Sequence, residues 1–206
     1  MAEDVASAAV GVFLETRPRL VSLAGGRTPE RFYLALSEAE YPWGEVELVM
    51  GDERCVEPGH PDSNAAMVER SLVAQVQPEA FHVLPGEHCD PEEADRRIRE
   101  ALRGRRLDLA VLGLGEDGHT ASLFPGDPAV EERERFVARV DRPDHPRLTL
   151  TLPVLSSARV ALFLVAGEEK RVALQRLLAG DDVPAARVRA DRVIVLADQA
   201  AAPVDR

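Results

Sequence analysis

Long apolar runs are missing from this chain of 206 residues: no stretch approaches the roughly 20 apolar residues that a membrane-spanning helix needs. Cysteine is scarce as well. Cys55 and Cys89 are too few to make a framework of disulfides, so a reducing cytosol is the expected compartment. The first 15 residues also lack the pattern of a secretory signal peptide. We therefore expect a cytoplasmic protein without a membrane segment.

Lysine is almost absent. Lys170 is the single lysine beside 24 arginines, which makes it a candidate for a task that needs a compact ammonium group; chance survival is the alternative. The formal net charge is −11. That charge argues against nucleic acid as a partner, because a phosphate backbone binds to a basic face. An anionic small molecule would need a local cluster of positive charge and backbone amides.

What the chain does contain is a regular alternation of strand-like and helix-like segments. Apolar residues at helical spacing predict helices over 3–15, 30–37, 65–76, 91–103 and 167–179. Short apolar runs predict strands over 19–24, at the end of 43–50, and over 81–84, 107–114, 136–140, 148–152, 159–166 and 192–197. The length suits one core, and no repeat or linker is evident. We expect an α/β fold: a single domain over residues 1–206 with a mostly parallel, doubly wound, Rossmann-like sheet flanked by helices.

The stretch LDLAVLGLGEDGHTASLFPG, residues 107–126, is the one around which the other segments are organised. Its apolar first half suits a strand buried on both faces of a parallel sheet. Glycines then allow a sharp turn, and a short helix is expected from about Thr120 to Pro125. His119 is thereby placed at the carboxyl end of a central strand, which is the edge where ligands bind in open α/β sheets.

Polar residues also follow three other predicted strands. The segments Gly25–Thr28, Asp52–Arg54 and Gly167–Lys170 each come directly after a strand, and Arg147 precedes a further one. Because the carboxyl ends of parallel strands share one edge of the sheet, these segments and the His119 loop should converge on one site. The first of them is a glycine turn that leads into a helix, which is a general anion-binding arrangement.

Two of these segments resemble a known family. DGHTASLFPG, residues 117–126, resembles the most specific signature of the 6-phosphogluconolactonases, which belong to a superfamily shared with the glucosamine-6-phosphate deaminases. AGGRTP, residues 24–29, resembles the family's SGGSTP. Ala24 and Arg27 replace two serines of that loop, so Arg27 would add a positive charge where the family has a hydroxyl.

Three further segments carry the same resemblance, which spans about residues 20–180. DER at 52–54, followed by His60 and by DSN at 62–64, resembles DERxVPxxHxxSN. RLTLTLP, which begins at Arg147, resembles RxTLTLP, and GEEK, which ends at Lys170, resembles GxxK. The resemblance implies the fold of that superfamily.

The resemblance also implies a reaction, the hydrolysis of 6-phospho-D-glucono-1,5-lactone to 6-phospho-D-gluconate in the oxidative pentose phosphate pathway. Hydrolysis needs an activated water, and an imidazole can take the water's proton and return it to the leaving ring oxygen. His119 is the expected base, and Asp117 either orients it or only fixes the glycine turn. Arg54 either contacts the substrate and its developing charge or is paired structurally with Asp52 or Glu53.

The substrate's phosphate is expected against the glycine loop, with two cations from other segments as counter-charges. The expected substrate and phosphate contacts are Gly25, Gly26, Arg27, Thr28, Asp52, Arg147 and Lys170. No GxSxG elbow is present and no covalent nucleophile is required, so Ser122 is interpreted as a helix-start residue. We expect no cofactor, a small sugar-phosphate lactone as the partner, and a monomer or small homo-oligomer.

A metal site is an alternative use of several residues. Cys55, His60, His88 and Cys89 are residue types that bind zinc, but their spacing fits no standard structural site. The adjacent His88 and Cys89 would also have difficulty facing one ion. We therefore expect no metal.

Two rival functions remain. In glucosamine-6-phosphate deaminase/isomerase the corresponding loop reads DGHIAFNEP, and its glutamate takes part in ring opening; this chain has Phe124 there, which cannot transfer a proton. That enzyme also has DEY where this chain has DER at 52–54. The second rival, of another class, is a non-catalytic sugar-phosphate-binding module. Such sensors usually carry a helix-turn-helix segment, for which the N-terminal region is too short.

Overall fold

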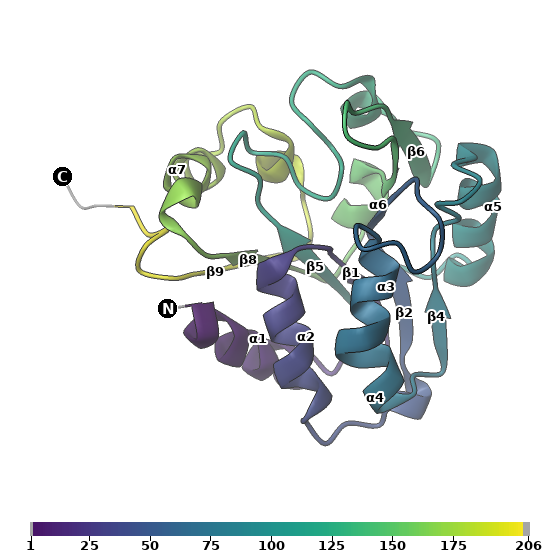
Figure 1. Ribbon diagram of the computed structural model, residues 1–206. Helices are drawn as coiled ribbons and strands as arrows, with labels where there is room; N and C mark the ends of the chain where they lie inside the picture. Colours follow the sequence, from purple (N-terminus) through teal and green to yellow (C-terminus); the bar gives the residue numbers. More distant parts are fainter. Residues whose placement is uncertain (1, 204–206) are drawn as a thin grey trace.

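Six parallel strands form the central sheet of the computed structural model, which describes residues 2–203 (Figure 1). Their spatial order is β4 (Ala80–His82), β2 (Glu47–Met50), β1 (Leu20–Leu23), β5 (Leu109–Gly113), β8 (Val160–Val165) and β9 (Arg192–Ala197). The chain proceeds outward from β1 in one direction and then returns to place β5 on the other side of β1. The carboxyl ends of β1 and β5 therefore flank the point where the strand order reverses, where ligands bind in this class of fold.

Helices cover this sheet, as the alternation of segments predicts. In Figure 1, α1 (Ala2–Thr16), α2 (Arg27–Ser37) and α3 (Asn64–Val68) follow one another along the sheet, and α1 packs against β8 and β9. A π-helical turn, η2 (Glu69–Val73), joins α3 to α4 (Ala74–Val76). The remaining helices are α5 (Pro91–Leu102), α6 (Leu152–Ser156) and α7 (Arg171–Ala179), with short 3₁₀ turns η1 (Trp43–Glu45), η3 (Pro128–Glu131), η4 (Glu168–Lys170) and η5 (Pro184–Arg187). The expected single-domain, mostly parallel α/β fold is confirmed.

A second, antiparallel sheet stands beside the first. It contains β3 (Asp52–Arg54), β7 (Arg147–Leu150) and β6 (Val137–Val140), in that order. The sequence predicts Asp52–Arg54 as a loop, whereas it pairs with β7 as a strand. Gly51 connects the two sheets: its N–H donates to the Leu23 carbonyl at 2.8 Å, and its own carbonyl accepts from Leu150 N–H at 2.8 Å. The chain thus passes from β2 into the second sheet with its backbone groups paired.

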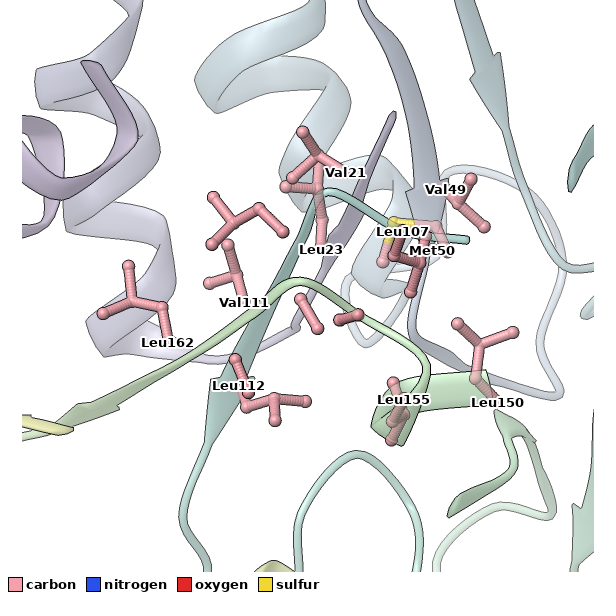
Figure 2. Close-up of a cluster of buried hydrophobic side chains, with 14 of the residues drawn as sticks. Val21, Leu23, Val49, Met50, Leu107, Val111, Leu112, Leu150, Leu155 and Leu162 are labelled. Atoms are coloured by element: carbon pink, nitrogen blue, oxygen red, sulfur yellow. The ribbon is translucent and has the colours of Figure 1, made fainter. Parts of the chain in front are cut away.

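The core surrounds the parallel sheet and includes buried residues of its covering helices and of the second sheet. Figure 2 shows Val21 and Leu23 of β1, Val111 of β5 and Leu162 of β8 among these side chains, and each is at most 1% exposed. Burial of a leucine or valine side chain contributes about 1.5–3 kcal/mol. Strands that are buried on both faces give the loops at their carboxyl ends a rigid base.

The expected helix from Thr120 to Pro125 is wrong. The segment instead makes an isolated bridge between Thr120 and Leu123. Thr120 Oγ1 donates to the Gly113 carbonyl at 2.9 Å, and Ala121 adopts a left-handed φ of 47°. Six residues that end in proline gain too few helical hydrogen bonds to offset the cost of nucleation, so these local contacts decide the conformation.

The two cysteines are also not as expected, because they form a disulfide. Cys55 follows β3 and Cys89 precedes α5, and their Cα atoms are 5.2 Å apart. The separation of 34 residues gives no indication of this proximity, which comes from the packing of the α5 approach against β3. Within residues 2–203, no helix combines the length and apolar character needed to cross a bilayer.

Candidate active site

A cleft of about 750 Å³ opens at the carboxyl ends of β1, β2, β5 and β8. All ten residues that the sequence predicts for the site line it: Gly25, Gly26, Arg27, Thr28, Asp52, Arg54, Asp117, His119, Arg147 and Lys170. Its volume falls within the range of ordinary small-molecule sites. The polar segments that are far apart in the sequence therefore share one cavity.

The glycine loop after β1 forms one wall. Gly26 is the N-cap of α2 with φ 105° and provides no side chain to bond the first amides of the helix. Gly25 admits no side chain at all, because a Cβ there would lie 2.0 Å from Oδ1 of Asn64. The Asn64 side chain is held in turn by its Nδ2, which donates to the Asp52 carbonyl at 3.0 Å. The backbone N–H groups at the start of α2 are thus left for an anion in the cleft.

Three cations lie in or near this loop in the lining of the cleft. Arg27 opens α2, and Arg31 follows one helical turn later on the same side. Lys170 ends η4 after β8, and it has no ion pair or side-chain hydrogen bond within residues 2–203. The sequence does not predict Arg31 as a site residue. The predicted helix begins at residue 30, whereas α2 begins at Arg27, which places Arg27 and Arg31 in an i, i+4 relation. The three side chains offset the negative net charge locally.

His119 and Asp117 form a hydrogen-bonded pair on the loop after β5. Nδ1 of His119 lies 2.6 Å from Oδ1 of Asp117, and the same oxygen accepts from the backbone N–H of His119 at 3.0 Å. Partial burial acts to raise the pKa of Asp117, but these bonds and the imidazole outweigh it and lower the pKa. An ionised Asp117 accepts from Nδ1–H, so the lone pair of the neutral ring is on Nε2.

Two residues fix the ring of His119. A Cβ on Gly115 would lie 2.0 Å from Nδ1, so only glycine leaves room for the imidazole. The Phe124 ring lies on another side of it, with ring centroids 4.3 Å apart. Phe124 is buried and also lies below the guanidinium of Arg142 at 4.1 Å. The imidazole is therefore held by packing as well as by its carboxylate partner.

Arg54 and Arg147 are direct cross-strand partners in the second sheet. Nη1 of Arg54 donates to the Asp62 carbonyl at 2.6 Å, and Nη2 of Arg147 lies 2.6 Å from Oδ2 of Asp144. The backbone N–H of His145 and then the Arg147 guanidinium lower the pKa of Asp144 to about 2. Within the described residues, Nε of each arginine is buried and has no hydrogen-bond partner. The two guanidinium groups thus place two like charges side by side in the wall of the cleft, where they favour negatively charged ligand groups.

The alternative role for Arg54, an ion pair with Asp52 or Glu53, is absent from the part of the chain that the structure describes. Glu53 is 2% exposed and accepts from the N–H groups of Asn64 and Ala65, each at 2.7 Å. Burial raises the pKa of this carboxyl, against the opposite effect of its hydrogen bonds. Glu53 thus anchors the start of α3 and leaves Arg54 free of a carboxylate partner.

Asp52 is held by Ser122. Oγ of Ser122 donates to Oδ2 of Asp52 at 2.7 Å, and both residues are buried. Ser122 is therefore a link between the two loops and not the first residue of a helix. Asp198 is another cleft residue that sequence reasoning missed; its carboxylate accepts from the Gly167 N–H at 3.1 Å. Asp198 lies directly beyond the last predicted strand, at the same edge as the other loops, and that position was the available signal.

Across residues 2–203, no group of three His, Cys, Asp or Glu side chains is placed to hold a metal ion. The zinc alternative has also lost two thiolates, because Cys55 and Cys89 are joined. The cleft instead combines an oriented imidazole with several cations and free amides. Such a site can activate water beside a negatively charged ligand.

Comparison of the sequence with known proteins relates this chain to one protein family. A family model described as glucosamine-6-phosphate isomerases/6-phosphogluconolactonase matches residues 1–196. The 6-phosphogluconolactonase of Synechocystis sp. is 39% identical over an alignment of 175 positions, which covers 80% of this chain and 73% of the relative. The Homo sapiens 6-phosphogluconolactonase is 35% identical over an alignment of 209 positions, which covers 92% of this chain and 81% of the relative.

Solved structures agree with the sequence relatives. The crystal structure of 6-phosphogluconolactonase from Thermotoga maritima superposes with a TM-score of 0.81 at 30% identity and covers 96% of this chain and 93% of its own. A monomeric glucosamine-6-phosphate deaminase superposes with a TM-score of 0.85 at 22% identity, covering 98% of this chain and 95% of its own. At that identity the second likeness concerns the fold alone.

Proposed function

Because the chain belongs to the family of glucosamine-6-phosphate isomerases and 6-phosphogluconolactonases, we propose that it hydrolyses 6-phospho-D-glucono-1,5-lactone to 6-phospho-D-gluconate in the pentose phosphate pathway. The observation that supports this best is the Asp117–His119 pair beside a cationic glycine loop. The His119–Asp117 pair can activate the water that hydrolyses an ester. The cationic glycine loop can bind the phosphate of the substrate.

In this proposal His119 is the general base. Nε2 takes a proton from a water molecule as the water oxygen attacks C1 of the lactone, while Asp117 stabilises the resulting imidazolium. The tetrahedral intermediate carries negative charge on the former carbonyl oxygen, and Arg54 supplies the positive charge that stabilises it. His119 then returns the proton to the ring oxygen as the C1–O bond breaks. The products are a carboxylic acid, which ionises, and a free hydroxyl.

The phosphate is assigned to the part of the cleft lined by the glycine loop. Backbone N–H groups of Gly25–Thr28 and the side chains of Arg27 and Lys170 bind its oxygens, and Arg147 contributes from the second sheet. Charge-assisted hydrogen bonds of this kind are about twice as strong as neutral ones. The buried Asp52, held by Ser122, accepts from a sugar hydroxyl.

Phe124 disfavours the deaminase activity that other members of the family have. It occupies the position of the deaminase glutamate, and its ring packs against the imidazole of His119. A phenyl group transfers no proton during ring opening. We expect the enzyme to act as a monomer or a small homo-oligomer. We place the enzyme in the cytoplasm on the ground of its substrate class, which belongs to central carbohydrate metabolism. The cysteine content no longer supports this placement, because Cys55 and Cys89 form a disulfide.

An assay with freshly made 6-phosphogluconolactone tests this function. 6-Phosphogluconate formation is followed with a coupling dehydrogenase, and spontaneous hydrolysis is subtracted. We expect acceleration that is proportional to enzyme concentration, and no ammonia release from glucosamine 6-phosphate. Hydrolysis no faster than the background would reject the proposal.

A further inference from the structure

We propose that the Cys55–Cys89 disulfide is a thiol–disulfide exchange site that fixes the position of Arg54, so that opening it by a thiol reductant lowers the activity. The inference rests on the proposed function, because Arg54 is assigned to the developing negative charge. It commits to one class of partner, a dithiol or a thiol that exchanges with disulfides.

Cys55 is the residue next to Arg54 at the end of β3. Its backbone N–H donates to the Pro146 carbonyl at 2.8 Å and so extends the ladder in which Arg54 pairs with Arg147. The disulfide holds this end of β3 to Cys89, which precedes Asp90, the N-cap of α5. One covalent bond therefore connects the strand that carries Arg54 to a helix of the first half of the chain.

The segment before Cys89 lies directly on the backbone of Arg54. A Cβ on Gly86 would be 2.6 Å from the Arg54 carbonyl oxygen and 3.2 Å from that of Val56. Because Gly86 is in close contact with the Arg54 backbone, Arg54 has no space to shift towards this segment while the disulfide is closed. When the bond opens, the segment can move away and β3 loses that support.

Few polar contacts fix the Arg54 side chain. Within residues 2–203 it has no ion pair, its Nε has no hydrogen-bond partner, and Nη1 bonds to the backbone carbonyl of Asp62. That carbonyl belongs to the loop that follows Cys55. The placement of the guanidinium thus depends on the backbone on both sides of the disulfide.

The disulfide is accessible to a reagent. Cys89 is half-buried, and its neighbours His88 and Asp90 are exposed. Cys89 also holds a left-handed φ of 49°, which is unfavourable for a residue with a Cβ.

Reduction of the disulfide proceeds by two successive thiol–disulfide exchanges. A thiolate of the reductant attacks one protein sulfur, a mixed disulfide forms, and the other cysteine leaves as a thiolate. A second thiol of the reductant then resolves the mixed disulfide, so that the protein gains two electrons and two protons and the reductant becomes a disulfide. Oxidation by a small-molecule disulfide reverses the sequence.

The test compares kcat and KM of the oxidised, the reduced and the reoxidised full chain, with the redox state verified by thiol alkylation and mass. We expect reduction to lower kcat several-fold to about 10²-fold, the range caused by small misplacement of a catalytic group, with a smaller change in KM and recovery on reoxidation. The variant Cys55→Ser/Cys89→Ser should have the reduced-state kcat and no redox response.

Amide hydrogen exchange over residues 52–63 is measured in the same samples. We expect faster exchange after reduction. Equal kcat in both states, or a lower Tm on reduction with unchanged kcat, would overturn the proposal and leave the disulfide a purely stabilising bond. Absence of lactonase activity in the oxidised protein would reject the proposed function, and unchanged exchange would then still reject the positioning role of the disulfide.

Discussion

Gly115 and His119 fit together with no space for an added methyl group. The Gly115 N–H donates to the His119 carbonyl at 2.8 Å, and the Gly115 Cα lies against the imidazole so closely that a Cβ would be 2.0 Å from Nδ1. The glycine in this loop therefore sets the orientation of the ring that it faces. Its role is steric, in addition to the flexibility that a sharp turn needs.

The variant Gly115→Ala should misplace the imidazole and lower kcat by roughly 10²-fold. The expected KM change is small, because the phosphate contacts are elsewhere. Gly11→Ala in α1 is the matched control, since a Cβ at Gly11 meets nothing within 4 Å. Comparison of kcat for the two variants checks the prediction, and equal activity would show that the loop adapts.

Removal of the general base, His119, should lower kcat at least as much as the Gly115→Ala substitution does. His119→Ala should keep the fold and lower kcat by roughly 10²–10⁴-fold, the usual contribution of a general base. The exposed His88, which pairs with Glu93, provides the control variant His88→Ala. Background-corrected rates measure the activity of both variants, and circular dichroism verifies that both are folded. A folded His119→Ala enzyme with near-normal turnover would remove His119 from the mechanism.

The variant Lys170→Ala should weaken the binding of the substrate's phosphate group. We expect KM for the phosphorylated lactone to rise and hydrolysis of unphosphorylated gluconolactone to stay the same, because the latter has no phosphate for the ammonium to bind. If the phosphate also anchors the lactone against His119, kcat falls together with affinity. The measurement is the ratio of kcat/KM for the two lactones. Arg96→Ala, which removes a surface cation from α5, is the control for loss of charge alone, and a constant ratio in Lys170→Ala would mean that Lys170 is a surface residue.

The ionised carboxylate of Glu47 should stabilise the fold at neutral pH and lose this effect in acid. Partial burial acts to raise the pKa of this carboxyl, but bonds from His82 and Arg105 lower it below its ordinary value of 4.5. A carboxyl whose folded-state pKa is lowered stabilises the fold above its unfolded pKa, and this contribution is lost as pH falls through the folded value. Glu47→Gln should therefore lower the free energy of unfolding at pH 7 by about 1–3 kcal/mol. Urea titrations at pH 7 and below pH 4 should show the difference shrinking, and a constant difference would refute the linkage.

Chelation should leave the reaction unchanged. Water activation is assigned to an imidazole, and no carboxylate, histidine and cysteine cluster suitable for a metal occurs between residues 2 and 203. Prolonged treatment with a strong chelator should preserve kcat and KM. Loss of activity that added zinc restores would contradict the assignment.

The elements with periodic patterns were predictable from the sequence, and the contacts that depend on tertiary structure were not. The apolar run of β5 and the glycine loop before α2 indicated strands, helices and one common edge. The strand Asp52–Arg54 was missed because three polar residues have no strand-like pattern of their own; their partner strand β7 determines the pairing. The disulfide was missed for the same reason, since only the folded chain brings Cys55 near Cys89.

A shifted helix start and a long-range hydrogen bond explain why the sequence did not predict the roles of Arg31 and Ser122. Arg31 faces the cleft because α2 begins at Arg27, three residues before the expected start. The interpretation of Ser122 as a helix start failed because its hydroxyl bonds to a buried carboxylate 70 residues away in the sequence. Such long-range hydrogen bonds leave no trace in local periodicity.

The meeting of the two sheets at Gly51 has a thermodynamic consequence. The cleft takes His119 and Lys170 from the parallel sheet but Arg54 and Arg147 from the antiparallel one. A ligand that contacts both groups binds only when the sheets are docked, so its binding free energy adds to their cohesion. Ligand at 100 times its Kd would raise the unfolding free energy by about 2.7 kcal/mol. Partial unfolding that separates the antiparallel sheet should therefore become rarer in a cell rich in substrate or product.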